Sequence, residues 1–218
     1  MVTTGPGGTN ALTGVTAAYI ESTPMIVLSG QVKRADMVNG QGIRQQGMQE
    51  VDIISMVKPV TKYAALVTGP QDIKYHLDRA LYGAVHGRKG PVWLDIPLDV
   101  QGAVIETENL RAYDPAENPE QKPQEISQEI IEKILDKIEE SHRPVLSPGN
   151  GVRLAGAIGE FHELVEFLGV PVVTGMSSVD ALESDHLYFA GRSGGTGTRA
   201  GNFALQNSDV LLSIGNRQ

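Results

Sequence analysis

The residues best suited to ligand chemistry form a glycine-rich turn flanked by threonines, TTGPGGTNALTG at residues 3–14. Glycines in such a turn let the backbone approach a ligand where a Cβ atom would collide. One interpretation is an anion site, in which backbone N–H groups and the positive end of a following helix face a phosphate. The spacing matches neither the phosphate-binding loop ending in Gly-Lys-Ser/Thr nor the dinucleotide fingerprint, whose third glycine or alanine is Asn10 here. A closely packed turn without a ligand is the second interpretation.

Other arrangements typical of catalysis are not found in the sequence. The turn SPGNG at 147–151 is not a nucleophile elbow, which requires G-x-S-x-G. The absence of cysteine excludes disulfides and thiolate metal sites. The histidines lack a ligand spacing such as H-E-x-x-H, and we interpret them as surface or helix-face residues: His76, His86, His142, His162 and His186.

The charge balance narrows the class of partner. Eighteen Lys and Arg residues against 26 Asp and Glu residues give a net charge of −8. Nucleic acids and anionic membranes require a basic surface, so neither is an expected partner. No apolar run reaches the roughly 18–20 residues that span a bilayer, and no signal peptide precedes the first motif. The sequence therefore predicts a cytoplasmic protein.

Strands alternate with helices along most of the chain, which predicts βαβ units with parallel sheets and hence an α/β fold. In the first half we expect helices at 9–22, 49–57 and 70–87, and strands at 24–30, 62–67 and 91–97. In the second half we expect helices at 125–142, 153–169 and 201–209, and strands at 143–152, 171–175 and 209–215.

A Pro-rich segment interrupts this alternation. Residues 101–124 carry Pro115, Pro119 and Pro123 among charged residues, which indicates an exposed, extended linker. We therefore expect two α/β domains, at 1–100 and 125–218, joined by this linker. Both are expected to be incomplete, because VTT at the start resembles the tail of a strand and the last buried strand lacks a following crossover. The chain is thus interpreted as a fragment, whose half-finished sheets should expose apolar surface.

Four blocks in order resemble thiamine-diphosphate enzymes of the acetolactate synthase type. They are the GPGGTN turn with its helix, STPMIVLSGQ, QEVDIISMVKPVTKY and GRKGPVWLDIPLDV. These blocks resemble the C-terminal part of the family's pyrimidine-binding domain. The segment from RPVLSPGNGV to FALQNSDVLLSIG is similar to the start of its central domain. The resemblance covers essentially the whole chain, and it implies that the GPG turn lies against the aminopyrimidine ring of the cofactor.

The resemblance implies roles for individual residues in the first domain. Pro6, Gly7 and Asn10 would contact the aminopyrimidine ring of thiamine diphosphate. Gln31 and Gln49 match active-site glutamines, whose amides would orient the cofactor or a substrate carbonyl.

Three features depart from the family pattern. Family acetolactate synthases carry phenylalanine and lysine at the substrate-pocket positions occupied here by Met48 and Leu98. Arg88 matches a flavin-contacting arginine, but the Met-His-Gly element that touches the flavin is replaced by GTGTRAGN at 195–202. These departures favour a related carboligase or decarboxylase acting on another 2-oxo acid, and they leave bound FAD open.

The resemblance also implies magnesium as a second cofactor, a 2-oxo acid substrate, and a homodimer or homotetramer whose active site forms between subunits. In the family, the glutamate that protonates the pyrimidine ring precedes the GPGGTN block. Magnesium is held there by a Gly-Asp-Gly…Asn motif in a third domain, and GDG does not occur in this chain. We therefore expect the isolated 218 residues to be inactive. A non-catalytic nucleotide- or flavin-binding module, built on 148–152 and 194–202, and a regulatory paralogue remain alternatives.

Overall fold

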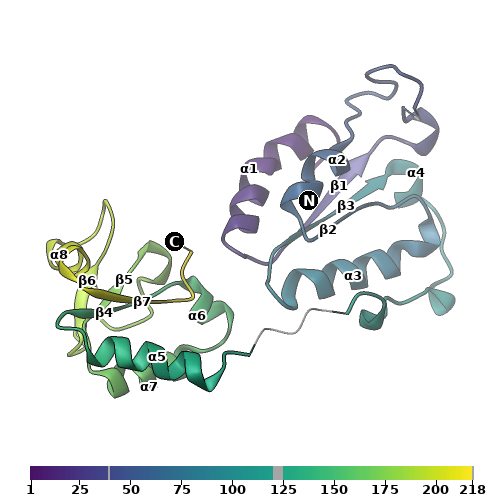
Figure 1. Ribbon diagram of the computed structural model, residues 1–218. Coiled ribbons are helices and arrows are strands. Elements are labelled where there is room, and N and C mark those ends of the chain that lie inside the picture. The colour runs from purple at the N-terminus through teal and green to yellow at the C-terminus, as the bar shows by residue number, and fades with distance from the viewer. Residues whose placement is uncertain (39, 120–124, 218) are drawn as a thin grey trace. The chain divides into compact units, whose positions relative to one another are not determined.

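A computed structural model of the chain describes residues 1–38, 40–119 and 125–217. The chain divides into two compact units, Met1–Lys122 and Pro123–Gln218, each built around its own parallel sheet (Figure 1). The predicted α/β fold is therefore confirmed in both halves of the chain.

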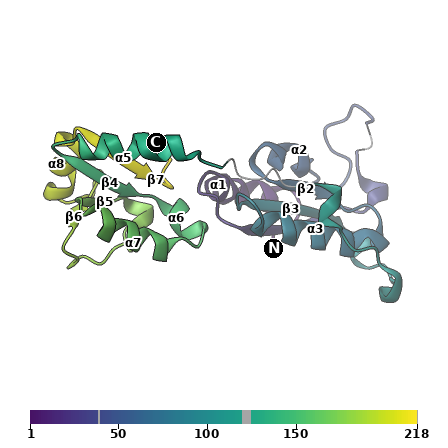
Figure 2. The same cartoon turned by 60° about the horizontal axis from the view of Figure 1, so that its bottom comes forward.

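The first unit has three parallel strands in the order β1-β3-β2. These strands are β1 (Met25–Gln31), β2 (Tyr63–Leu66) and β3 (Pro91–Pro97). Its main helices are α1 (Pro6–Ile20), α2 (Ile53–Val57), α3 (Ile73–Val85) and α4 (Leu98–Gln101). Figures 1 and 2 show α1 and α2 on one face of the sheet and α3 on the other. Val2, in the expected strand tail, pairs in parallel with Ser29 on β1.

Side-chain alternation along the strands decides what each face buries. Val27 and Trp93 pack in the apolar cluster that α1 and α2 close, whereas Val92 and Leu94 pack in the cluster that α3 closes. Trp93 is fully buried, and truncating a buried aromatic residue to alanine typically costs about 3–5 kcal/mol. Strand β3, paired on both sides and almost entirely buried, is therefore the centre of the unit.

The second unit has four parallel strands in the order β6-β5-β4-β7. These strands are β4 (Pro144–Pro148), β5 (Val172–Thr174), β6 (Phe189–Arg192) and β7 (Val210–Ile214). The helices are α5 (Gln128–Glu139), α6 (Asn150–Leu154), α7 (Ile158–Leu168) and α8 (Arg199–Asn207). Figure 2 shows α5 on one face of this sheet and α6 and α7 on the other. No helix in the described parts of the chain is both long and apolar enough to span a membrane.

Several predicted elements differ from those in the structure. The helix expected at 153–169 is two helices, α6 and α7, because Gly156 adopts a positive φ of 74° between them. The helix expected at 49–57 begins only at Ile53, capped by Asp52. Strand β6 was not predicted, since its four residues include Gly191 and show no apolar alternation.

The segment predicted as an extended linker is not extended throughout. It forms short helical turns at Thr107–Asn109 and Pro115–Glu117. The Arg111 guanidinium lies 4.4 Å from the centre of the Tyr75 ring on α3, and the Tyr113 ring meets the Tyr75 ring edge-on at 5.7 Å. The segment 107–118 is thus a strap that packs on α3. Its composition, prolines among charged residues, is the same as that of an extended linker, and only the ring contacts distinguish the two. Residues 120–124 lie outside the described residues.

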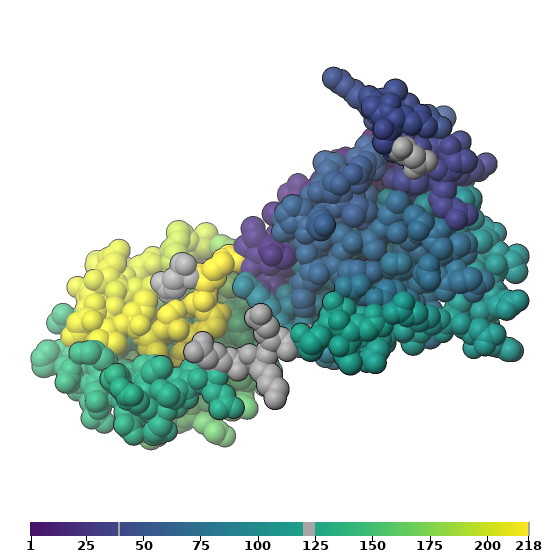
Figure 3. Space-filling view, turned by 45° about the vertical axis from the view of Figure 1, so that its right-hand side comes forward, coloured from purple at the N-terminus to yellow at the C-terminus, as the bar shows by residue number. Residues whose placement is uncertain are grey.

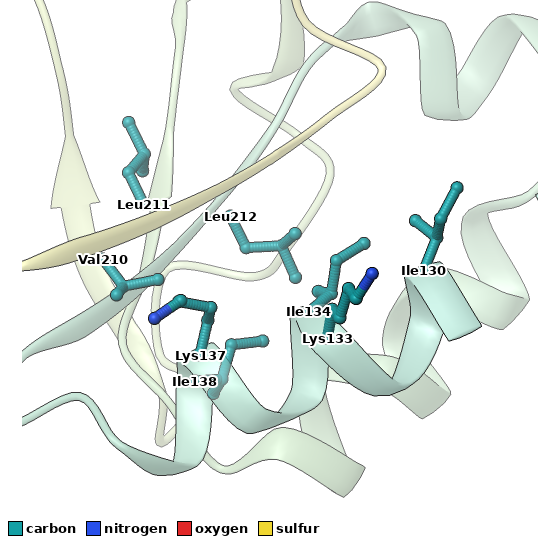
Figure 4. A pocket seen from close by; sticks show the side chains of 8 residues that line it. All are labelled: Ile130, Lys133, Ile134, Lys137, Ile138, Val210, Leu211 and Leu212. Carbon is teal, nitrogen blue, oxygen red and sulfur yellow. The ribbon is translucent and has the colours of Figure 1, made fainter. Parts of the chain in front are cut away.

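Helix α5 covers the edge strand β7 only in part. An apolar groove of about 260 Å³ lies between them (Figure 4), lined by Ile130, Lys133, Ile134, Lys137, Ile138, Val210, Leu211 and Leu212. The side chain of Ile130 is 50% exposed and that of Leu211 is 40% exposed. Apolar surface of the kind the sequence predicted is thus exposed on this face.

One carboxylate joins two turns at the amino-terminal edge of this sheet. The Asp209 carboxylate accepts hydrogen bonds from the Ser141 hydroxyl and from the backbone N–H groups of His142 at 2.9 Å and Arg143 at 2.8 Å. These hydrogen bonds, that from Ser141 first, hold the pKa of Asp209 well below its usual range. The turn after α5 is thereby tied to the start of β7.

Replacing Asp209 with asparagine is expected to lower the thermal midpoint of the second unit at pH 7. A depressed carboxylate pKa stabilises the fold above the unfolded-state value of about 3.9, and this stabilisation is lost as pH falls through the folded-state value. The midpoint difference between wild type and variant should therefore shrink toward pH 2 in circular-dichroism melts. Asp185→Asn, at an exposed position, is the matched control. Equal effects of the two variants would contradict the assignment.

Candidate functional site

The carboxyl ends of β1 and β3 gather most of the residues singled out in the sequence. Gln31 is the last residue of β1, and Leu98 directly follows β3. The Val2 bridge to Ser29 places the following glycine turn at the same edge. Ligands of parallel α/β sheets bind outside the carboxyl ends of the strands. This edge is therefore the candidate site of the first unit.

The glycine turn and the loop before α2 cross at Gly5 and Gln49. Gly5 has a φ of 59° and a ψ of −114°, a conformation that essentially requires glycine. A Cβ atom added at Gly5 would lie 2.0 Å from the carbonyl oxygen of Gln49. Gln49 itself has a φ of 60°, which is uncommon for a residue with a side chain. Strained backbone of this kind, where two segments meet, is typical of functional sites.

A buried polar network lies beneath this crossing. Asp95 accepts hydrogen bonds from the Ser29 hydroxyl at 2.5 Å and from the Gln31 amide nitrogen at 2.9 Å. The Trp93 indole N–H donates to Ser29 Oγ at 2.7 Å. These residues meet because β1 and β3 pair with Ser29 opposite Asp95 and Val27 opposite Trp93. All of them lie on the sheet face that α1 and α2 cover, by the strand alternation described above.

Among the carboxyl groups at the carboxyl ends of β1 and β3, Asp95 has the most strongly shifted pKa. Burial raises the pKa of its carboxyl to about 6, while the hydrogen bonds from Ser29 and Gln31 act in the opposite direction. The nearby Asp52 carboxylate adds to the rise. Carboxyl groups whose pKa values approach neutrality cluster at functional sites.

The residues expected to contact the cofactor ring form an exposed strip on α1. Pro6 and Asn10 are both exposed and stand four residues apart, one helical turn, on the same face. Gly7 lies beside this strip, where an added Cβ atom would come within 2.6 Å of the Thr3 methyl group. Pro6 offers an apolar ring and Asn10 offers an amide on the same face of the helix. Together they suit a flat heterocycle that has hydrogen-bonding groups at its edge. The residues present thus fit the ring end of thiamine diphosphate.

The two glutamines differ in their surroundings. Gln31 is 5% exposed, and its amide makes four hydrogen bonds within the chain. Gln49 has an exposed side chain at the edge of the turn. Met48 and Leu98, the predicted pocket residues, are 84% and 56% exposed. Of these four residues, only Gln31 is part of the buried network.

Arg88 lies at the amino-terminal ends of the strands, whereas the other predicted residues lie at their carboxyl ends. Its Nε donates a hydrogen bond to the hydroxyl of Ser22 at 2.8 Å. Ser22 precedes β1 and Arg88 precedes β3, so both lie at the amino-terminal ends of parallel strands. The first unit therefore does not bring the predicted flavin residue together with the glycine turn.

Sequence reasoning missed Ser29, Glu50 and Asp95. Asp95 gave a signal that could have been used, because a carboxylate inside the apolar run PVWLDIP must find a buried partner. Ser29 could not be found this way, since its role follows from the register between β1 and β3.

Glu50 organises the loop between β1 and α2. Its carboxylate accepts the backbone N–H groups of Val38 at 2.5 Å, Gln46 at 3.0 Å and Gly47 at 3.1 Å. Burial opposes ionisation of Glu50, but the three N–H groups outweigh it and hold its pKa below the usual value. Figure 3 shows the dark-blue atoms of this region projecting from the unit. The loop that carries Met48 and Gln49 is thus tied down at its base by one side chain.

Replacing Glu50 with glutamine should loosen this loop without unfolding the unit. An amide oxygen accepts weaker hydrogen bonds than a carboxylate, so exchange of the Val38, Gln46 and Gly47 amide hydrogens should accelerate about tenfold. Hydrogen–deuterium exchange followed by NMR measures this effect. Glu106→Gln, at an exposed position of the same unit, is the control. Unchanged exchange at all three amides would show that Glu50 does not hold the loop.

Three glycines in the turns of the second unit are closely packed by backbone, whereas an added Cβ atom at Gly194 or Gly195 would meet nothing within 4 Å. Added Cβ atoms at Gly149 and Gly151 would lie 2.3 Å and 2.7 Å from the carbonyl oxygen of Gly215. At Gly201, a Cβ atom would lie 2.4 Å from the Arg192 carbonyl oxygen. Close contact between backbone segments therefore explains Gly149, Gly151 and Gly201 without a ligand. Within the described ranges, no group of three or more His, Cys, Asp or Glu residues could hold a metal ion.

Comparisons with known proteins bear on both units. Residues 1–56 match the thiamine pyrophosphate enzyme N-terminal TPP binding domain, and residues 131–218 match the thiamine pyrophosphate enzyme central domain. The probable acetolactate synthase large subunit of Methanocaldococcus jannaschii is 36% identical over 223 residues, which cover 99% of this chain and 36% of that protein. Acetolactate synthase isozyme 3 large subunit of Escherichia coli is 33% identical over 224 residues, covering 100% of this chain and 37% of that protein.

The acetolactate synthase large subunit of Corynebacterium glutamicum is 36% identical over 223 residues, covering 100% of this chain and 33% of that protein. The chain therefore spans about a third of the length of the curated relatives it matches. The two domain matches fall one on each structural unit, in the order in which the units occur. The chain belongs to the thiamine pyrophosphate enzyme family.

Proposed function

We propose that this chain is part of a thiamine-diphosphate-dependent 2-oxo acid decarboxylase or carboligase of the acetolactate synthase type. The carrying observation is the glycine turn, locked against Gln49 at the carboxyl edge of the sheet, with Pro6 and Asn10 exposed beside it. The names of the relatives, acetolactate synthase large subunits, support a 2-oxo acid as the substrate.

When bound, thiamine diphosphate supplies the nucleophile and electron sink for 2-oxo acid decarboxylation. Pro6, Gly7 and Asn10 would hold its aminopyrimidine end at the carboxyl edge. Gln31 would fix the surrounding segments, because its amide is fully occupied within the chain. The exposed amide of Gln49 is the better candidate for contact with a substrate carbonyl.

Met48 and Leu98 would line the substrate side of the site. Both are apolar and exposed at the edge that carries the glycine turn. An apolar wall discriminates among 2-oxo acids by side-chain size, with about 1–3 kcal/mol for each methylene group. We propose that the accepted 2-oxo acid differs in size from the substrate of enzymes with phenylalanine and lysine at these positions.

Metal binding and subunit assembly would involve the longer protein of which this chain is part. Magnesium and the diphosphate would be held by residues outside this chain, since the relatives are about three times longer than this chain. We propose a homodimer or homotetramer located in the cytoplasm. Flavin is not part of the proposal, because Arg88 lies at the far edge of the sheet from the glycine turn.

The test is turnover by the full-length parent protein with pyruvate and larger 2-oxo acids, measured with and without thiamine diphosphate and magnesium. We expect cofactor-dependent release of carbon dioxide, and Asn10→Ala should raise the cofactor concentration needed for half-maximal activity about tenfold. Thr13→Ala, exposed on the same helix, is the control. Failure to turn over any 2-oxo acid, or a flavin-binding signal unaffected by thiamine diphosphate, would overturn the proposal.

A further inference from the structure

We propose that Asp95 is a positioning residue of the site, whose carboxylate fixes the Gln31 amide and, through it, three chain segments around the glycine turn. The effect on cofactor binding rests on the proposed function, whereas the hydrogen-bond network does not. Asp95 is 1% exposed. It therefore acts through other residues of the chain.

The first step is the orientation of the Gln31 amide. A carboxylate and a backbone carbonyl can only accept hydrogen bonds. Gln31 Nε2 lies 2.9 Å from Asp95 Oδ2 and 2.9 Å from the Val51 carbonyl oxygen, so the NH₂ group must face these two acceptors. Oε1 then accepts the Thr4 hydroxyl at 3.1 Å and the backbone N–H of Val32 at 2.9 Å. All four hydrogen-bonding positions of the amide are used.

The second step is what this amide holds. Thr4 directly precedes Gly5 of the glycine turn, and Val51 follows Gln49 by two residues. Val32 starts the segment that leaves β1. One amide group thus connects the turn, the loop bearing Gln49 and the end of β1. If the amide rotated, Oε1 would face the Val51 carbonyl and the Asp95 carboxylate, and the NH₂ group would face the Val32 N–H; only the Thr4 hydroxyl could reorient to keep its hydrogen bond.

The third step is what happens when Asp95 is protonated. Both of its partners at this edge, Ser29 and Gln31, donate to it. Protonation removes the negative charge, so the two charge-assisted hydrogen bonds become weaker neutral ones, and it adds an O–H donor that can reverse the contact with the Ser29 hydroxyl. Since burial raises the pKa of Asp95 to about 6, this change falls in a mildly acidic range.

The charges around Asp95 favour the same direction. Asp52, the N-cap of α2, acts on Asp95 across the site and disfavours its ionised form. Beyond the strand ends, the Arg34 guanidinium forms an ion pair with Asp99 of α4 at 2.7 Å, so its positive charge is paired with Asp99 and not with Asp95. Glu50 faces the backbone N–H groups of its own loop.

The protein carries a built-in reporter of this network. Its single tryptophan, Trp93, donates its indole N–H to Ser29 Oγ at 2.7 Å, and Ser29 in turn donates to Asp95. A change at the carboxylate therefore reaches the indole N–H through one hydroxyl group. The indole and the Gln31 side-chain amide give separate signals in a ¹H–¹⁵N NMR spectrum.

The experiment is a pH titration, from pH 4.5 to 8, of the chain of 218 residues without cofactor. We expect the Trp93 indole and Gln31 amide signals to shift together with a midpoint near 6. Asp95→Asn should abolish both shifts while circular dichroism shows that the fold is retained. Asp52→Asn, which removes the repulsive charge, should move the midpoint to lower pH. It also keeps the test decisive if Asp95→Asn fails to fold. Signals that do not titrate, or a midpoint that Asp52→Asn leaves unchanged, would overturn the inference.

A second measurement links the network to the site. In the full-length protein, Asp95→Asn should raise the KM for thiamine diphosphate about tenfold, with a smaller change in kcat. Asp114→Asn, at an exposed position of the same unit, should leave both constants unchanged. An unchanged cofactor KM in a folded Asp95→Asn protein would overturn the positioning role. Absence of any turnover by the wild-type protein would overturn the proposed function, with the pH titration still deciding the network.

Discussion

Replacing Gly5 with alanine is expected to destabilise the first unit by about 3 kcal/mol or more, combining backbone strain with overpacking. The new Cβ atom would lie 2.0 Å from the backbone carbonyl oxygen of Gln49, so no side-chain rotation relieves the clash. The φ of 59° with ψ of −114° adds a conformational penalty for any residue other than glycine. The glycine turn and the loop carrying Gln49 would have to separate, which would also disrupt the proposed cofactor site.

Urea unfolding followed by Trp93 fluorescence measures this effect, because Trp93 is buried in the first unit. Gly14→Ala is the matched control, since Gly14 lies in the same helix and an added Cβ atom there meets nothing within 4 Å. That substitution should stabilise the unit by about 0.5–1 kcal/mol, the usual gain for glycine to alanine in a helix. If Gly5→Ala were as stable as wild type, the crossing at Gln49 would not exist as described.

Replacing Gln31 with leucine is expected to destabilise the first unit by about 2–4 kcal/mol at pH 7. The substitution removes all four hydrogen bonds of the Gln31 amide. The Val51 carbonyl and the Asp95 carboxylate keep one donor each, the Ile53 N–H and the Ser29 hydroxyl, but the Thr4 hydroxyl and the Val32 N–H lose their acceptor. The penalty for each polar group left unsatisfied away from water is about 1–3 kcal/mol. Leucine and glutamine have similar volumes, so loss of packing contributes little. Gln71→Leu, at an exposed position of the same unit, should change stability by less than about 0.5 kcal/mol.

Gln31→Glu gives the same site a pH dependence of known sign. The introduced carboxylate would stand beside Asp95, and two close buried carboxylates raise each other's pKa. An acid whose pKa is raised in the folded state destabilises the fold progressively as pH rises from its unfolded value through its folded value. The variant should therefore lose more stability relative to wild type at pH 8 than at pH 5.5. A pH-independent difference in urea midpoints would argue against contact between these two side chains.

Much of the fold could be predicted from local pattern. The strands expected at 24–30 and 91–97 lie within one residue of β1 and β3. Such apolar runs bounded by glycine and proline have few alternatives to a buried strand. Two elements were predicted wrongly. Gly156 divides one predicted helix into two, and β6 was missed because Gly191 interrupts its short apolar run. The strap at 107–118 escaped prediction since its anchors are ring contacts with residues of α3 far along the chain.

The sequence by itself determined the α/β class and the family resemblance, because both depend on ordered local blocks that can be read without knowing what they contact. Only the tertiary structure decided which residues meet. It buried Gln31 as the junction of three segments, left Gln49 exposed and placed Arg88 at the other edge of the sheet. The physical reason is register: parallel pairing sets Ser29 opposite Asp95 across 66 residues of chain, and no local periodicity encodes a pairing over that separation.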